Sequence, residues 1–219
     1  MNHAKSSATN VVDLERYRDP DSLPVLNQIE EYWSSLRTGS HLPQRSDIDP
    51  RELGGALESS FILERIAPGV GRFRVAGQKV WSIIGMEVRG MPLTSLFDTS
   101  SRSPISAYFE DVLRGPSKAV LPIKAVPLRR GRSVSMKMLL LPLQGENGTA
   151  DRILGGLEPC QAVPQAPHRL RLSSGKVTCD LIEDGRYISI EHRGFAEDRS
   201  EFTPSASQSE TDTPKLRLV

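Results

Sequence analysis

Between residues 23 and 36, apolar side chains recur at every third or fourth position and are separated by polar ones. Pro24 falls in the first turn of this segment, and Gly39 follows just beyond its end. A spacing of three to four residues places side chains on one face of an α-helix. The pattern therefore predicts an amphipathic helix whose apolar face carries Val25, Leu26, Ile29, Tyr32, Trp33 and Leu36.

Residues 49–57 carry the signals of a second, shorter helix. Asp49 can accept hydrogen bonds from the amides of the first turn, and Pro50 suits the first helical position. Glu52 stands where the carboxylate of a capping box reaches back. We expect a helix that begins after Asp49 and ends near Leu57, and capping explains these charged residues without a bound ligand.

Apolar and polar residues alternate in 61–66 and again in 72–76, which predicts two strands. In the second strand, Phe73 and Val75 should share one face, while the arginines beside them share the other. The sequence Pro-Gly-Val-Gly at 68–71 is typical of a turn. We therefore expect these two strands to form an antiparallel hairpin.

Helical signals then return for about forty residues. Residues 80–84 predict a short helix that ends at a glycine, and residues 90–97 are irregular enough to indicate only a turn of helix. The clearest helix follows, with Ser103 as its cap, Pro104 at its first position and Gly115 at its end. Its inward face should carry Ile105, Tyr108, Phe109, Val112 and Leu113.

Three more strands are predicted at 119–126, 134–143 and 152–158, and polar or glycine-containing turns join them into a meander. The chain thus runs as helix, two strands, three helical pieces and three strands. This order favours an α+β fold, in which one antiparallel sheet of five strands has helices packed on one face. A doubly wound α/β fold would need strands and helices to alternate throughout.

The apolar pattern divides the chain into four parts. Residues 1–21 are an N-terminal tail, and 22–160 form the domain together with its preceding helix. Residues 161–192 read as a basic linker that contains a hairpin, with strands at 176–182 and 186–190. Residues 193–219 are rich in Ser, Thr, Glu and Asp, which predicts a disordered tail.

Charge and composition limit the classes of partner that we expect the chain to bind. The 28 Lys and Arg residues against 27 Asp and Glu give a net charge of +1, which provides no general attraction for nucleic acid. No apolar run is long enough to span a membrane, and the N-terminus lacks the apolar stretch of a secretory signal. We therefore expect a cytoplasmic protein that binds neither nucleic acid nor membranes.

The chain has two cysteines, Cys160 and Cys179. They have no CxxC spacing and no histidine neighbours of the kind that hold zinc. The sequence therefore predicts two structural thiols in a reducing compartment and no metal site.

At this point the sequence resembles the PAS domains of a proteobacterial subfamily of short, stand-alone regulators. The resemblance covers about two thirds of the chain. Taken in order, the residues that carry it are Tyr32-Trp33, Leu36-Arg37, Leu42-Pro43-Gln44-Arg45, Asp47-Ile48-Asp49-Pro50, the segment from Arg72 to Gly77, and Gly85 followed by Gly90 to Phe97.

This resemblance implies a five-stranded antiparallel sheet that cups several short helices. A small apolar cavity between them either holds a ligand or is filled by side chains. If a ligand binds there, the residues expected to contact it are Phe73, Trp81, Ile84, Leu96, Tyr108, Val112, Met136 and Met138. Alternatively, these eight side chains pack against one another in an ordinary hydrophobic core.

No cofactor is expected. The haem-binding PAS domains, which this chain resembles in architecture, hold iron through a histidine on a central helix, and residues 79–115 contain no histidine. PAS domains that use flavin photochemistry carry a reactive cysteine after the second strand, where this chain has Trp81 and Ile84.

Arg129, Arg130 and Arg132 make a dense basic turn between two predicted strands. The simplest interpretation is a solvated hairpin tip. The functional interpretation is a docking site for an acidic surface of a partner protein or for a phosphorylated nucleotide messenger, because arginine presents a planar fork to carboxylate and phosphate groups.

The resemblance implies a sensory and regulatory module of bacterial signal transduction that acts through contacts with other signalling proteins, without catalysis. A nucleotide-messenger receptor that uses the arginine turn is one alternative. A small enzyme is another, but it would need paired titratable groups in a cavity whose predicted lining is almost wholly apolar. The apolar width of the helix at 23–36 also suggests a homodimer through that helix.

Overall fold

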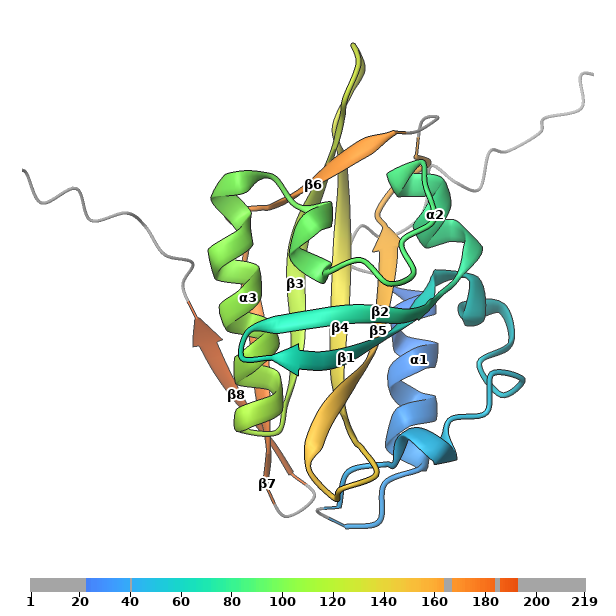
Figure 1. Ribbon diagram of the computed structural model, residues 1–219, viewed down its shortest axis with the longest axis vertical. Coiled ribbons are helices and arrows are strands. Elements are labelled where there is room, and N and C mark those ends of the chain that lie inside the picture. The colour runs from blue at the N-terminus through green and yellow to red at the C-terminus, as the bar shows by residue number, and fades with distance from the viewer. Residues whose placement is uncertain (1–22, 40, 164–166, 184–185, 193–219) are drawn as a thin grey trace, which may run out of the picture.

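The computed structural model describes residues 23–39, 41–163, 167–183 and 186–192, and it is built around one antiparallel sheet (Figure 1). The tails at 1–21 and 193–219 lie outside the described residues. The sheet has eight strands, and seven of them follow the order β2-β1-β5-β4-β3-β7-β8, while β6 pairs with β3. The fold is therefore α+β, as the order of predicted elements indicated, but the sheet is larger than the five strands expected.

The five predicted strands are present with longer bounds. They are β1 (Ser60–Ala67), β2 (Val70–Ala76), β3 (Ser117–Pro127), β4 (Val134–Gln144) and β5 (Ala150–Pro159). The α-helices are α1 (Pro24–Ser35), α2 (Gln78–Ile84) and α3 (Thr99–Arg114), and the 3₁₀ helices are η2 (Arg45–Asp47), η3 (Gly54–Ser59) and η4 (Leu93–Leu96).

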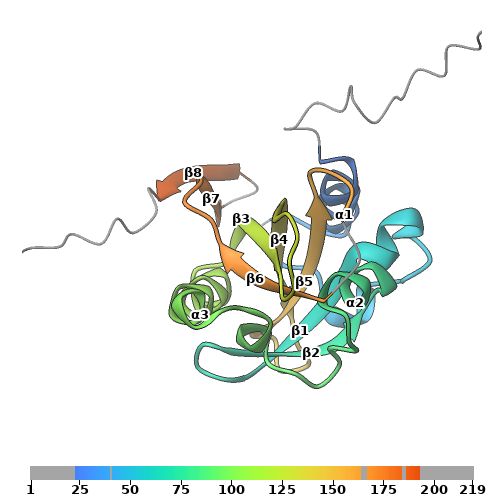
Figure 2. The same ribbon diagram turned by 90° about the horizontal axis from the view of Figure 1, so that it is seen from above.

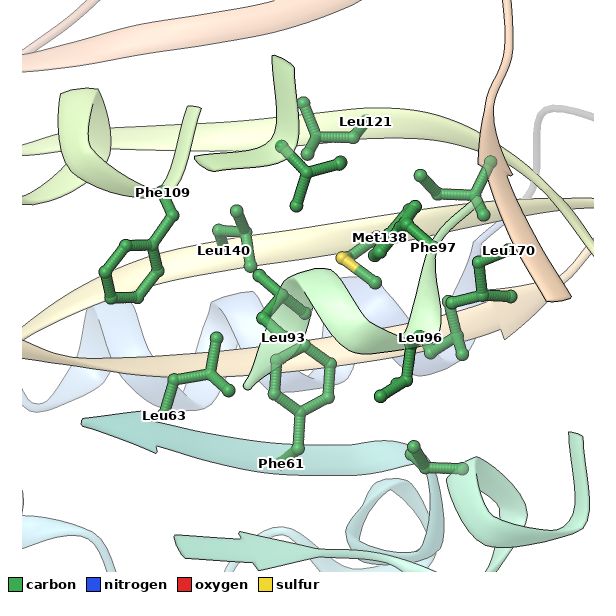
Figure 3. Close-up of a cluster of buried hydrophobic side chains, with 14 of the residues drawn as sticks. Phe61, Leu63, Leu93, Leu96, Phe97, Phe109, Leu121, Met138, Leu140 and Leu170 are labelled. Atoms are coloured by element: carbon green, nitrogen blue, oxygen red, sulfur yellow. The ribbon is translucent and has the colours of Figure 1, made fainter. Parts of the chain in front are cut away.

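Helices cover both faces of the sheet: those between β2 and β3 lie on one face, as predicted, and the predicted N-terminal helix lies on the other. On the inner face, α2, α3 and η4 pack on side chains that point from the central strands. Figure 3 shows this cluster, with Phe61 from β1, Leu93 and Leu96 from η4, and Met138 from β4 directed toward one another. On the outer face, α1 packs on a second apolar cluster. Figure 2 shows α1 and α3 on opposite sides of the sheet.

The strands β4 and β5 hold α1 in place. Trp33 is fully buried in the outer cluster, and its Nε1 donates to the carbonyl oxygen of Pro142 at 3.0 Å. At the start of the helix, Oε2 of the buried Glu158 accepts from the backbone amides of Val25 at 3.0 Å and Leu26 at 2.9 Å. A carboxylate from β5 thus satisfies two of the amides that every helix N-terminus leaves free.

The predicted start of α3 at Ser103 was wrong. The helix begins at Thr99, and its cap is Asp98, five residues before the predicted cap, because Oδ1 of Asp98 accepts from the amide of Ser101 at 3.1 Å. Pro104 lies inside the helix, where it cannot donate to the carbonyl of Ser100. Because residue 100 is exposed, water can satisfy that carbonyl.

The helix predicted at 49–57 was also wrong. Asp49 accepts from the amide of Arg51 at 2.9 Å, but the chain only turns there, and η3 begins at Gly54. The capping box lies earlier, where Gln44 and Asp47 bracket η2. Turns at 50–53, followed by the six-residue 3₁₀ helix η3, replace the expected helix.

The part of the chain expected to be a linker extends the sheet. β6 (His168–Leu172) pairs with the C-terminal half of β3, from Ile123 to Pro127. β7 (Val177–Glu183) pairs with the N-terminal half of β3, and β8 (Arg186–His192) pairs with β7 to complete a hairpin. Within the described part of the chain, the sheet therefore continues to residue 192.

Candidate functional site

Most of the residues predicted to contact a ligand are packed in the inner core. Phe73, Ile84, Leu96, Met136 and Met138 all belong to the inner cluster, and none exposes more than 5% of its surface. Phe73 meets Phe61 edge to face, with ring centroids 5.4 Å apart. These five side chains contribute to the hydrophobic core, as the alternative interpretation of the same set expected.

Trp81 does not face the core. It exposes 38% of its surface. The helix α2 buries Val80, Ile83 and Ile84, and successive residues of a helix point about 100° apart, so the side chain after Val80 points away from the core. Val75 is also exposed, contrary to prediction. The pairing of β1 with β2 shifts between Ile62 and Leu63, so the extra residue Arg74 forms a bulge and reverses the alternation.

The remaining two predicted residues, Tyr108 and Val112, reach a different place. They line a cleft of about 460 Å³ between the C-terminal end of α3 and β7. Figure 1 shows α3 beside the β7–β8 hairpin. The cleft is partly open to solvent, and its lining residues are Tyr108, Asp111, Val112, Arg114, Gly115, Ser117, Cys179 and Leu181.

Six of the eight cleft residues were not predicted as site residues. Two of them, Cys179 and Leu181, lie on β7, which joins the sheet through long-range pairing of Ala119 with Cys179 and of Ser117 with Leu181. The alternation in 176–182 predicted a strand, but no local signal showed which edge it would join. The cleft forms only because β7 pairs with the edge of β3.

Two titratable side chains of the cleft, Tyr108 and Cys179, are uncharged near neutral pH. Burial raises the pKa of the Cys179 thiol to about 11, and the negative charges of Asp111 and Asp180 add to the effect. Burial also raises the pKa of the Tyr108 hydroxyl, again with contributions from Cys179 and Asp111. Both groups therefore stay protonated and can donate hydrogen bonds.

Cys179 should consequently react slowly with alkylating reagents. A rise in pKa from 9.0 to about 11 lowers the thiolate fraction near neutral pH by about a hundredfold. In a Cys160→Ser variant, we expect iodoacetamide to modify Cys179 about a hundredfold more slowly at pH 8 than in the urea-unfolded chain. The rate should increase with pH up to about pH 11. Equal rates in the folded and unfolded chains would contradict the assignment.

A partly buried ionic cluster connects β7 to α1, which lies on the outer face of the sheet. Lys118 Nζ on β3 lies 3.1 Å from Asp180 Oδ2 on β7 and 2.8 Å from Glu30 Oε1 on α1. Burial alone would lower the pKa of Lys118, but the two carboxylates outweigh it and raise the pKa. The cluster ties α1, β3 and β7 together.

Carboxylates near α3 are also used in ion pairs. Glu110 accepts from Nε of Arg65 at 2.9 Å and from the amide of Gly69 at 2.8 Å, which fixes the β1–β2 turn to α3. The hydrogen bond from Arg65 lowers the pKa of Glu110. Across the described residues, no three potential metal-ligating side chains come together.

The arginine turn is exposed at the tip of the β3–β4 hairpin, which projects from the sheet (Figure 1). β6 adds to it, since its pairing places Arg171 opposite Lys124 and Arg169 opposite Val126. Arg169 donates to the carbonyl of Ser95 at 2.7 Å. We call these residues the basic surface: Lys124, Arg129, Arg130, Arg132, Arg169 and Arg171.

Acidic residues are scarce around the basic surface. The sequence has no Asp or Glu at 112–145 or at 159–179. Asp98 forms an ion pair with Arg171, and the pKa of Asp98 is lowered because hydrogen bonds from Ser101, Arg171 and Ser100 outweigh its burial. Within the described part of the chain, Arg171 is the only member of the basic surface that forms an ion pair, so most of the positive charge there is not neutralised.

The fold and the sequence agree on the family. Five strands of the sheet follow the order β2-β1-β5-β4-β3, and the helices α2, η4 and α3 lie between β2 and β3 in the chain. No described helix has the length and apolar character needed to cross a bilayer. No curated protein matches the chain. A family model for the PAS domain matches residues 22–158, which is more than half of the 219 residues, and the chain therefore belongs to the PAS domain family.

Proposed function

We propose that this chain is a non-enzymatic regulatory module that acts by binding other signalling proteins through its basic surface. PAS domains are typically sensory modules without catalytic activity. The basic surface carries the proposal, because it combines exposed cations from the β3–β4 hairpin with cations from β6. Such a surface fits an acidic segment of a partner.

The geometry of arginine supports this choice of partner. A guanidinium can donate two parallel hydrogen bonds to one carboxylate, and exposed charges increase the rate of encounter with an oppositely charged surface. Leu128 lies in the same turn and exposes 56% of its surface, so it offers an apolar contact beside the charges. A phosphorylated nucleotide would use the arginines in the same way but would not need Leu128.

The basic surface can be tested with a variant in which Arg129, Arg130 and Arg132 are all replaced by alanine. We expect the unmodified chain to bind a fluorescein-labelled peptide of alternating glutamate and leucine, measured by anisotropy. Loss of three charge-assisted contacts should weaken that binding by about tenfold or more. The circular dichroism spectrum should not change, because all three side chains are exposed.

A charge-matched control separates a specific surface from general attraction. Replacing the exposed Arg51, Lys79 and Arg89 by alanine removes the same number of charges from elsewhere on the chain. This control should leave peptide binding unchanged. If both variants lose affinity equally, the basic surface has no special role. If calorimetry instead shows that nucleotide messengers bind more tightly than the peptide, the chain is a nucleotide receptor.

A further inference from the structure

The cleft between α3 and β7 is distinct from both the packed core and the basic surface. At about 460 Å³ it falls within the range of sites that hold small molecules. One wall comes from α3 with Tyr108 and Val112, and the other from β7 with Cys179 and Leu181. The two walls are brought together only when β7 pairs with β3.

The cleft has hydrogen-bonding groups that are not used inside the protein. Among the described residues, none forms a hydrogen bond with the hydroxyl groups of Tyr108 and Ser117, although both residues are buried. The thiol of Cys179 faces the same space and stays protonated. The two hydroxyl oxygens are not among the fully buried unpaired side-chain atoms of the described residues, so they are accessible from the cleft and can form hydrogen bonds with a ligand.

The charged residues of the cleft do not select for an ionic ligand. Asp111 and Arg114 both line the cleft from the last turn of α3, so its charged residues are of opposite sign and give no net charge that would attract an anion or a cation. Arg114 also lies 3.6 Å from Glu110, which offsets part of its positive charge. The interior is lined by the apolar side chains of Val112 and Leu181 together with neutral polar groups. This favours a ligand without net charge.

We propose that the cleft between α3 and β7 binds a small, uncharged and mainly apolar molecule that carries a hydrogen-bonding group. This site shares Tyr108 and Val112 with the ligand contacts expected from the sequence, but five of the other expected residues pack in the core, so the cleft differs from the expected internal cavity. It also does not depend on the basic surface. The two proposals can therefore fail separately.

Indole is a suitable probe, because it is neutral and mainly apolar, and its N–H group can donate to the hydroxyl oxygens of Tyr108 and Ser117, which accept as well as donate. We expect indole to cause saturable changes in the backbone amide NMR spectrum of the full chain, centred on residues 108–117 and 179–181. Indole-3-acetate and tryptamine present the same ring with a negative or a positive charge. Both should bind more weakly than indole.

Gly115→Leu is designed to fill the cleft. A Cβ at Gly115 would lie 3.7 Å from Cδ2 of Leu181, which is an ordinary contact, and the φ of −112° at this position suits any residue. We expect Gly115→Leu to raise the Kd for indole at least about tenfold. Gly55→Leu adds the same side chain where no atom lies within 4 Å, so it should leave the Kd unchanged.

Three results would overturn the proposal. The first is the absence of saturable changes up to millimolar indole. The second is a set of spectral changes centred outside residues 108–117 and 179–181, or a Kd for indole that is the same in Gly115→Leu as in the unmodified chain. The third is tighter binding of a charged analogue than of indole, which would reject a neutral ligand. The peptide-binding variants of the basic surface should bind indole normally.

Discussion

Replacing Trp33 by alanine is expected to lower the free energy of unfolding by about 3–5 kcal/mol. Trp33 is the largest side chain in the outer cluster and has no exposed surface. Its removal leaves a cavity between α1 and the sheet, and it also leaves the carbonyl of Pro142 without its donor. Urea denaturation followed by circular dichroism measures the change.

Trp81 provides the matched control, because it is the only other tryptophan in the chain. It lies on α2 with 38% of its surface exposed. Trp81→Ala should therefore lower the free energy of unfolding by less than about 1 kcal/mol. If Trp33→Ala proves no more destabilising than Trp81→Ala is expected to be, the assignment of Trp33 to the core of the domain is wrong.

The expected loss of stability in Trp33→Ala would show that α1 is an integral part of the domain. Without α1, the apolar side chains of Ile62, Leu139 and Leu154 on the outer face would be exposed to water. The helix therefore completes the core and is not an appendage. Its apolar face is already covered by the sheet of the same chain, so a homodimer through α1 would have to use its polar side.

The central strands could be predicted because their signal is local. The strand predicted at 119–126 became β3 at Ser117–Pro127, and the strand predicted at 134–143 became β4 at Val134–Gln144. Each contains a run of apolar and β-branched residues bounded by turn residues, and that pattern does not depend on the partner strand. The inner face of α3 was predicted for the same reason.

Features that depend on a distant partner were missed. β6 has five residues with the sequence His-Arg-Leu-Arg-Leu, and its charges suggested a linker. It is a strand because the edge of β3 from Ile123 to Pro127 is available for pairing. The bulge at Arg74, which exposes Val75, likewise follows from the register with β1. The cleft could not be predicted, since it exists only once β7 has joined β3.

The packing of Gly77 shows why one residue in the PAS-like segment 72–77 is a glycine. The residue lies between the end of β2 and the start of α2, and its amide donates to the carbonyl of Ser60 at 2.8 Å. A Cβ at Gly77 would lie 2.3 Å from the carbonyl oxygens of both Leu57 and Glu58. These are backbone atoms, which cannot rotate away as a flexible side chain can.

Gly77→Ala is therefore expected to lower the free energy of unfolding by about 2–4 kcal/mol, because η3 and the start of α2 must move apart. Gly55→Ala is the control, since a Cβ there meets no atom within 4 Å. It should leave stability unchanged or raise it by up to about 1 kcal/mol, because alanine restricts the unfolded chain. Equal urea midpoints for the two variants would mean that the close approach of Gly77 to η3 does not exist in solution. A large loss confined to Gly77→Ala would instead show that the contact between η3 and the start of α2 requires glycine.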